Sequence, residues 1–258
     1  SQVQRLKENG VSLIGASVGV GAETPGRTEA LVAAGVNVIT IDIAHGHSIQ
    51  MIETLKWIKE HYPKVDVIAG NLATPDAARE LIEAGADAIK VGIGPGSMCT
   101  TRIITGCGLP QLTAIALCAE VADTYGVPVI ADGGMRTSGD IVKAFAAGAS
   151  TVMLGGMLSG TIETPGQVKH GRKEYRGMAS KSAQDSWRGG VPEGMAPEGE
   201  ATFVNIKGHV KDVILEITGG IRSGMSYINA TSFEDIRNNA LFVEMTFNGI
   251  RESKAHGL

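Results

Sequence analysis

Short apolar runs rich in β-branched residues alternate with amphipathic segments along the first 156 residues of the chain. This alternation is typical of βαβ units, because a strand can reach a parallel neighbour only through a crossover connection. It therefore predicts an α/β fold with a parallel sheet. The expected strands are 11–18, 36–44, 65–71, 88–93, 128–134 and 150–156. The expected helices are 26–34, 48–61, 75–84, 110–125 and 138–147.

Three of the expected helices end in an Ala-Gly pair just before the next strand, at Ala34-Gly35, Ala84-Gly85 and Ala147-Gly148. Glycine readily takes the left-handed conformation that ends a helix, which supports these boundaries. After Gly160 the pattern changes to loop and hairpin, followed by helices around 209–217 and 232–240. Six strands are compatible with a doubly wound sheet, or with an eight-stranded barrel that lacks two strands. No Gly-x-Gly-x-x-Gly motif follows the first strand, which disfavours a dinucleotide-binding doubly wound fold.

The composition of the 258 residues, 43% of them apolar with a net charge of −4, is typical of one soluble domain. No run of about 18 apolar residues and no leader sequence is found, so we expect a cytoplasmic protein without a membrane partner. Lysine and arginine are scattered, which argues against a nucleic-acid partner. The three cysteines lack CxxC spacing, which argues against a disulfide framework or a zinc site.

One cysteine follows an expected strand directly, in the segment Gly94-Pro95-Gly96-Ser97-Met98-Cys99-Thr100-Thr101-Arg102. Glycine-rich loops at the carboxyl ends of parallel strands are where α/β barrels place their reactive groups. Cys99 is therefore the candidate nucleophile. We expect Cys107 and Cys118 to be structural.

Further motifs follow the other expected strands in order. They are Asp42-Ile43-Ala44-His45-Gly46-His47, Ala69-Gly70-Asn71, Ala131-Asp132-Gly133-Gly134, Met153-Leu154-Gly155-Gly156 and Tyr175-Arg176-Gly177-Met178. With the cysteine loop, they make the chain resemble the IMP dehydrogenase and GMP reductase family over nearly its whole length. The resemblance implies a (β/α)8 TIM barrel whose first two strands precede this region. Residues 1–258 would then be a single, N-terminally incomplete catalytic domain with a flap or hairpin insertion at about 161–208. In many dehydrogenases of the family a CBS pair lies just upstream, so truncation or processing is one explanation.

The segment between Gly177 and Gly208 bears on which of the two reactions the chain would catalyse. Similar IMP dehydrogenases carry an Arg-Tyr pair there that activates water, and this chain has none. The tail Arg222-Ser223-Gly224-Met225 instead looks like IMP dehydrogenase. We predict a GMP reductase that forms IMP and ammonia with NADPH through a cysteine adduct. The alternatives are an NAD-dependent IMP dehydrogenase and a non-catalytic nucleotide-binding remnant.

The resemblance also implies roles for individual residues. Cys99 would attack C2 of the purine, with Thr101 and Glu198 supplying the general acid that ammonia release needs. Asp132 would bind the ribose hydroxyls. The competing interpretations are a solvated carboxylate for Glu198, a turn cap for Thr101 and a helix cap for Asp132. The other nucleotide-binding candidates are Ser97, Gly133, Gly134, Gly155, Gly156, Tyr175, Gly177, Met178 and Ala179.

The expected dinucleotide site and cation site lie at the same sheet edge. The dinucleotide candidates are Asp42, His45, Asn71, Gly92 and Gly94. A divalent metal at His45 and His47 is disfavoured by their spacing on a loop. K⁺ would be held by the carbonyls of Gly94, Gly96 and Cys99. In the family, Glu252 and Ser253 of a neighbouring subunit complete that site, but Lys254 replaces the usual histidine here. The resemblance implies a homotetramer.

Overall fold

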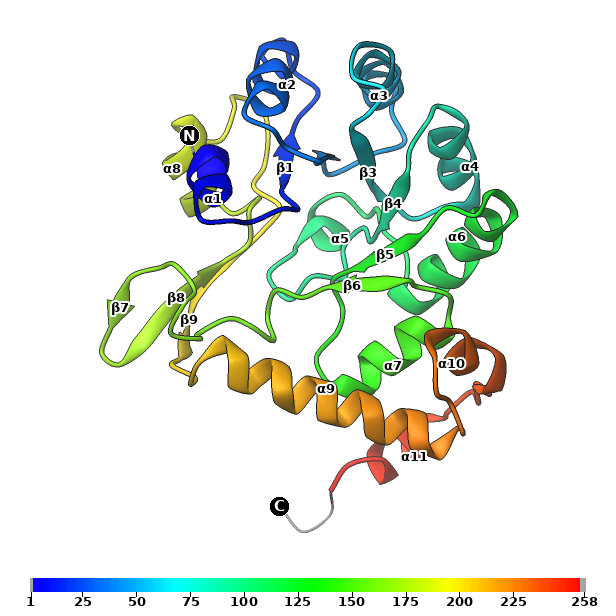
Figure 1. The fold of residues 1–258 in the computed structure, drawn as a ribbon. Helices are drawn as coiled ribbons and strands as arrows, with labels where there is room; N and C mark the ends of the chain where they lie inside the picture. Colours follow the sequence, from blue (N-terminus) through cyan, green and yellow to red (C-terminus); the bar gives the residue numbers. More distant parts are fainter. Residues whose placement is uncertain (1, 256–258) are drawn as a thin grey trace.

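A computed structural model describes residues 2–255 of the chain. Within these residues, six parallel strands pair in chain order from β1 to β6 and form one curled sheet (Figure 1). The strands are β1 (Gly15–Val18), β2 (Val38–Asp42), β3 (Asp66–Leu72), β4 (Ala88–Val91), β5 (Val129–Asp132) and β6 (Thr151–Met153). The predicted α/β fold and its six parallel strands are confirmed, with each strand shorter than or close to the predicted run.

Helices cover the outer side of this sheet (Figure 1). The crossover helices are α2 (Thr24–Ala33), α3 (Ile49–His61), α4 (Pro75–Glu83), α6 (Gln111–Tyr125) and α7 (Ser138–Ala146). Gly35, Gly85 and Gly148 follow three of them with φ of +90°, +106° and +107°. The predicted Ala-Gly helix ends are therefore confirmed, because these left-handed residues redirect the chain toward the next strand.

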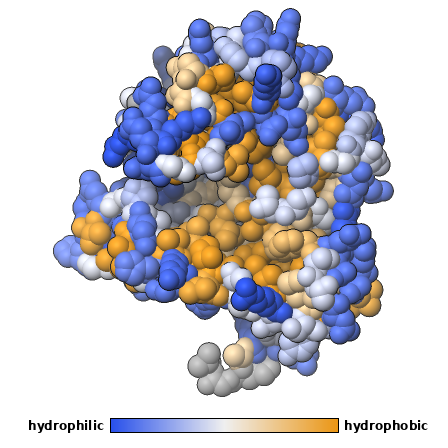
Figure 2. Space-filling view, viewed as in Figure 1, coloured by the Kyte–Doolittle hydropathy of each residue, from blue (hydrophilic) through white to orange (hydrophobic). Residues whose placement is uncertain are grey.

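The sheet is open in the part of the chain that the structure describes. β1 pairs only with β2, and β6 only with β5, whereas every residue of the central strand β4 is buried. This half-barrel agrees with the prediction of a barrel that lacks two strands; the complete eight-stranded barrel stays a prediction. Figure 2 shows an apolar recess between the part of the molecule that carries α2 and the part that carries α9.

A second sheet lies beside the open side of the half-barrel (Figure 1). Among the described residues it has three antiparallel strands, β7 (Val168–Lys169), β8 (Arg172–Arg176) and β9 (Ala201–Asn205). Helix α8 (Lys181–Arg188) lies between β8 and β9 in the chain. Ser180 caps its first turn, since the Ser180 hydroxyl accepts a hydrogen bond from Ala183 N. The sequence pattern predicted loop and hairpin here and did not indicate this helix.

The remaining helices are α1 (Gln2–Glu8), α5 (Thr101–Ile104), α9 (Val210–Tyr227), α10 (Phe233–Asn239) and α11 (Phe247–Glu252). The predicted end of α9 near Ile217 is wrong, since the helix continues to Tyr227 through Gly219 and Gly220. The glycines do not break the helix because α9 packs against α7 there. Among the described residues, no helix has both the length and the apolar character needed to cross a membrane.

The contact between α7 and α9 predicts opposite effects for the adjacent substitutions Gly219→Ala and Gly220→Ala. A Cβ at Gly219 would meet open space, whereas one at Gly220 would overlap the Ser138 side chain. Gly219→Ala should stabilise the protein by about 0.5–1 kcal/mol through helix propensity. Gly220→Ala should destabilise it by about 1–3 kcal/mol through overpacking. Urea unfolding followed by circular dichroism measures both, and equal effects would contradict this close contact.

Candidate functional site

The cysteine loop leaves the sheet at Gly92, directly after β4. Gly92 has φ +151°, and a Cβ there would overlap the carbonyl oxygen of Asp132 in β5. Gln111, the first residue of α6, donates from Nε2 to the carbonyls of Val91 at 2.9 Å and Asp132 at 3.1 Å. The ends of β4 and β5 are therefore tied together where the loop begins. Gln111 was not among the predicted site residues, since no sequence motif distinguishes a glutamine at a helix start.

Cys99 lies in this loop within a chain of hydrogen bonds. Its backbone N–H donates to the Gly96 carbonyl at 3.1 Å, which forms a tight turn. Its thiol donates to Thr101 Oγ1 at 3.2 Å, and Thr101 Oγ1 donates to Glu198 Oε2 at 2.7 Å. The three predicted catalytic residues are thus in contact, although Glu198 lies 97 residues after Thr101. Such a chain can move a proton from the thiol to the carboxylate.

Backbone pairing brings Glu198 to the cysteine loop. The Thr100 N–H donates to the Glu198 carbonyl at 3.0 Å, and the Glu200 N–H donates to the Met98 carbonyl at 2.8 Å. On the other side, the Glu198 N–H donates to the Ala179 carbonyl at 3.1 Å. The segment around Glu198 is therefore held between the cysteine loop and the start of α8. A cavity of about 490 Å³, lined by Thr100, Ser180 and Gly199 among others, lies beside it.

Four of the predicted nucleotide-binding residues also come together. Ser97 Oγ and Tyr175 Oη share a hydrogen bond of 3.0 Å between the cysteine loop and β8. A Cβ on Gly156 would lie 3.0 Å from Ser97 Oγ, and one on Gly155 would lie 3.3 Å from Tyr175 Oη. The two glycines after β6 thus leave open backbone beside two hydroxyl groups. Hydroxyls and free backbone N–H groups are common ligands of phosphate.

The other predicted nucleotide residues border the same loop. A Cβ on Gly133 would lie 3.2 Å from Gly96 N, and one on Gly134 would lie 3.3 Å from Pro95 Cβ. A Cβ on Gly177 would lie 3.2 Å from Met98 Cβ.

The next two residues, Met178 and Ala179, differ in how accessible they are to a ligand. Met178 is exposed. The Ala179 carbonyl already accepts from Gln184 Nε2 at 2.8 Å as well as from Glu198 N. A contact from this carbonyl to a base would compete with these two bonds.

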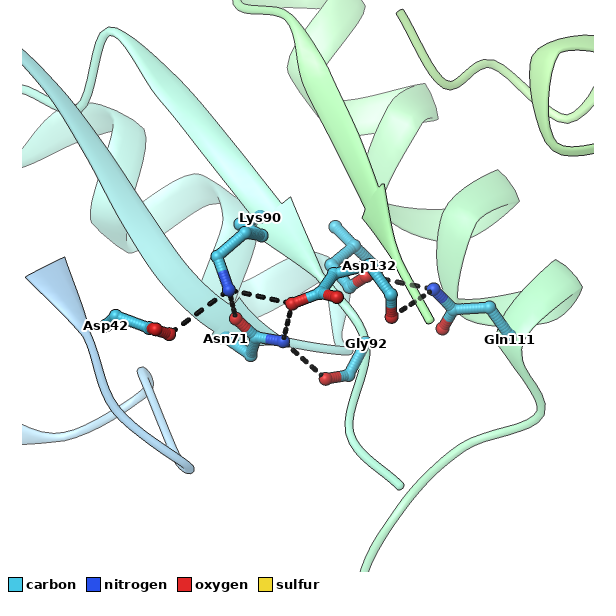
Figure 3. A network of polar contacts seen from close by, with 7 residues as sticks. Asp42, Asn71, Lys90, Gly92, Gln111 and Asp132 are labelled. Atoms are coloured by element: carbon cyan, nitrogen blue, oxygen red, sulfur yellow. Dashed lines mark hydrogen bonds and ion pairs between the residues drawn. The ribbon is translucent and has the colours of Figure 1, made fainter. Parts of the chain in front are cut away.

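A buried lysine joins the predicted ribose and dinucleotide residues (Figure 3). Lys90 Nζ, from β4, lies 2.8 Å from Asp132 Oδ2 and 3.1 Å from Asp42 Oδ1, and it also donates to Asn71 Oδ1. Asn71 Nδ2 donates to Asp132 Oδ2 at 3.0 Å and to the Gly92 carbonyl at 2.8 Å. The Asn71 amide is thus engaged by protein groups at both ends. Lys90 was not among the predicted site residues, because residues 88–93 were predicted to form a buried apolar strand.

The structure decides against Asp132 as a helix cap. Its carboxylate contacts Lys90 and Asn71, whereas the cap of α7 is Thr137, whose hydroxyl accepts from Asp140 N at 3.1 Å. Asp132 therefore keeps a position at the open carboxyl end of β5, as the ribose role requires.

The two loop histidines, His45 and His47, follow β2 in the chain. His47 Nε2 lies 3.1 Å from Glu80 Oε2, and the ring centroids of His45 and His47 are 6.4 Å apart. Among residues 2–255 no cluster of three or more His, Cys, Asp or Glu side chains is arranged to hold a metal ion. Of the carbonyls predicted to hold K⁺, that of Gly96 accepts the Cys99 N–H and keeps a second lone pair.

The burial of each cysteine predicts which thiols an alkylating reagent reaches in the folded protein. Cys107 is exposed, Cys99 is half-buried, and Cys118 is buried in α6, where burial raises the pKa of its thiol to about 12. Because the thiolate is the reactive form, Cys118 stays protonated and unreactive at pH 8. Iodoacetamide followed by peptide mass spectrometry should label Cys107 in the folded protein and Cys118 only after unfolding. Equal labelling of Cys107 and Cys118 in the folded protein would contradict this burial.

Comparisons with known proteins show the family to which the chain is similar. A family model described as IMP dehydrogenase / GMP reductase domain matches residues 2–256. The inosine-5'-monophosphate dehydrogenase of Aquifex aeolicus is 52% identical over 94% of this chain, and that of Bacillus subtilis is 47% identical over 96%. The chain spans 52% and 53% of these two relatives, about half of their length.

A solved structure with a similar backbone is named as a GMP reductase. It is a cysteine-to-alanine variant of GMP reductase from Trypanosoma brucei in complex with guanosine 5'-monophosphate. It superimposes with a TM-score of 0.90 at 49% identity, over 95% of this chain and 52% of that one. On the family match over almost all of its residues, the chain belongs to the IMP dehydrogenase / GMP reductase family.

Proposed function

We propose that this chain carries the reactive centre of a purine nucleotide oxidoreductase in which Cys99 attacks C2 of the bound base. The observation that carries this proposal is the hydrogen-bonded chain from the Cys99 thiol through Thr101 to Glu198. A thiol is a nucleophile only after it loses its proton. In this arrangement the thiol proton passes to Thr101 while the Thr101 proton passes to Glu198, which leaves a thiolate and a neutral carboxylic acid.

The residues around Cys99 suit a nucleoside monophosphate. The hydroxyls of Ser97 and Tyr175, with the backbone at Gly155 and Gly156, would bind the phosphate. The Asp132 carboxylate would accept hydrogen bonds from the ribose hydroxyls. The cysteine loop follows β4, and Asp132 ends the neighbouring strand β5, so the loop begins beside the proposed ribose acceptor, which supports a purine held over Cys99.

We propose dehydrogenation of IMP as the reaction, which the sequence analysis placed second. The curated relatives named above are IMP dehydrogenases, and this favours it over the predicted reductase. The Cys99 thiolate would add to C2 of IMP, and the hydride at C2 would leave to NAD⁺, so that the purine is oxidised. Water would then add to C2 and expel the thiolate, which gives XMP. Glu198, once it has released the first proton to solvent, can take the proton of that water through Thr101.

Reductive deamination of GMP is the second candidate, and one sequence feature favours it. No Arg-Tyr pair occurs between Gly177 and Gly208, so the water-activating pair of similar dehydrogenases is missing. The neutral Glu198 formed by the relay could instead protonate the amino group that leaves C2 as ammonia, after Cys99 has added there. Hydride transfer to C2 would then expel the thiolate and give IMP. The solved GMP reductase at 49% identity supports this candidate.

A nicotinamide dinucleotide, NAD⁺ or NADPH, would accept or supply the hydride in either reaction. The Asp42 side chain fits such a ligand, since it is 51% exposed and can accept ribose hydroxyls beside the loop that carries His45. Gly92 and Gly94 follow β4, whose Lys90 contacts Asp42. K⁺ at the cysteine loop, a homotetramer and a cytoplasmic location remain proposals carried by family resemblance.

Assays of the parent protein and of Cys99→Ala distinguish the candidates. IMP with NAD⁺ should produce NADH at 340 nm, whereas a reductase would oxidise NADPH with GMP. Cys99→Ala should remove turnover and leave nucleotide affinity within about tenfold, because the ribose and phosphate contacts are retained. Turnover by Cys99→Ala would overturn the covalent mechanism. If the parent protein binds a nucleotide without turnover, the result would support the alternative of a non-catalytic nucleotide-binding remnant.

The proton relay predicts a large effect for Glu198→Gln, with Glu193→Gln as the matched control. Both glutamates lie in the same connection, but Glu193 is exposed and Glu198 contacts Thr101. Glu198→Gln should lower turnover by about 10²–10⁴-fold, the usual contribution of general acid–base catalysis. In the dehydrogenase the covalent adduct should form more slowly than in the parent, since the Cys99 proton has lost its acceptor, and it should also be hydrolysed more slowly, since the attacking water has lost its base. Acid quenching and intact-protein mass spectrometry measure the adduct, and equal activities of the two variants would exclude the relay.

A further inference from the structure

Lys90 is almost completely withdrawn from water, although lysine is rarely buried without a partner. It occupies the third position of β4, in the run Ala-Ile-Lys-Val, where all four residues are buried. Its side chain is 3% exposed, compared with 24% for Asp132 and 51% for Asp42. A cation in such a position is costly unless charged and polar partners surround it.

The partners of Lys90 account for all of its donors. An ammonium group has three N–H bonds, and Nζ has acceptors in Asp42, Asp132 and Asn71. With all three N–H bonds donated, the nitrogen has no lone pair for attack on a substrate, so Lys90 is not a nucleophile. Its chemistry is that of a fixed positive charge between two carboxylates.

The contacts at Asp132 fix which of its oxygens stays open. Lys90 Nζ and Asn71 Nδ2 both contact Oδ2 of Asp132, at 2.8 Å and 3.0 Å. Oδ1 then points away from these donors and can accept a hydroxyl of a ligand. Without the ammonium, the carboxylates of Asp132 and Asp42 would repel each other, and Asp132 would lose one of the two bonds that set its rotamer.

We propose that Lys90 is a positioning residue that holds Asp132 in the orientation that selects a ribonucleotide and holds Asp42 toward the dinucleotide. This inference rests on the proposed function, which gives these carboxylates their ligands. Lys90 acts through the two carboxylates and does not touch the substrate. Its loss therefore removes ribose selectivity rather than Cys99 reactivity.

The test compares the affinities of IMP and 2′-deoxy-IMP for the parent, Lys90→Met, Lys90→Gln and Asp132→Asn. The control is Lys173→Met, because Lys173 is also buried but donates to the carbonyls of Thr161 and Ile162, outside the site. The parent should prefer IMP by about tenfold or more, the value of one charge-assisted hydrogen bond. The ratio of the affinity for IMP to that for 2′-deoxy-IMP should fall close to one in Lys90→Met and Asp132→Asn. It should stay at the parent's value in Lys173→Met. Lys90→Gln, which keeps N–H donors, should retain part of the preference.

The outcomes separate this inference from the proposed function. A parent that binds neither nucleotide overturns the proposed function, and the inference with it. A parent that discriminates, together with a folded Lys90→Met that discriminates equally, overturns the inference alone. Loss of the folded state in both Lys90 variants, seen by circular dichroism, assigns Lys90 to folding and also overturns it. Additive losses in the Lys90→Met, Asp132→Asn double variant would show that Lys90 does not act through Asp132.

Discussion

The close approach of β4 and β5 at their carboxyl ends determines where every other part of the site lies. Gly92 leaves β4 against the carbonyl of Asp132 with no room for a Cβ, and Gln111 bonds to the last carbonyl of each strand. The cysteine loop must therefore begin beside Asp132, within reach of the network of Lys90 and Asn71. The proposed nucleophile, the proposed ribose acceptor and a buried lysine come from two adjacent strands, β4 and β5, because parallel strands end at one edge.

The connection between α8 and β9, which carries Glu198, contacts the cysteine loop. Its residues pair through backbone atoms with Met98 and Thr100 on one side and with Ala179 on the other. These bonds do not depend on side-chain identity, so they fix the position of the chain and leave the Glu198 side chain free to contact Thr101. In the proposed function, the same contact would serve a base or an acid, according to whether Glu198 holds a proton. One scaffold would then suit both reactions named among the relatives.

The sequence predicted those features that local chemistry determines. Alternating apolar runs predicted the six strands, and Ala-Gly pairs predicted three helix ends. The cysteine after a buried strand indicated the loop beside Asp132, and its role as nucleophile stays a prediction. The sequence could not reveal Lys90, whose partners come from three other strands, nor Gln111, which bonds only to backbone atoms. The partnership of Glu198 with Thr101 came from resemblance alone, because no local pattern links residues so far apart. Helix α9 was predicted too short because a Gly-Gly pair usually weakens a helix, and the packing of α7 overrides that tendency.

Trapping of the covalent adduct on Cys99 tests the central claim most directly. The protein is mixed with IMP and NAD⁺, or with GMP, then quenched in acid and digested, and the peptides that contain Cys99, Cys107 and Cys118 are weighed. The account predicts a purine nucleotide attached to the Cys99 peptide, at a level that rises within the first turnover. Turnover without any adduct on Cys99, or an adduct confined to Cys107, would contradict it.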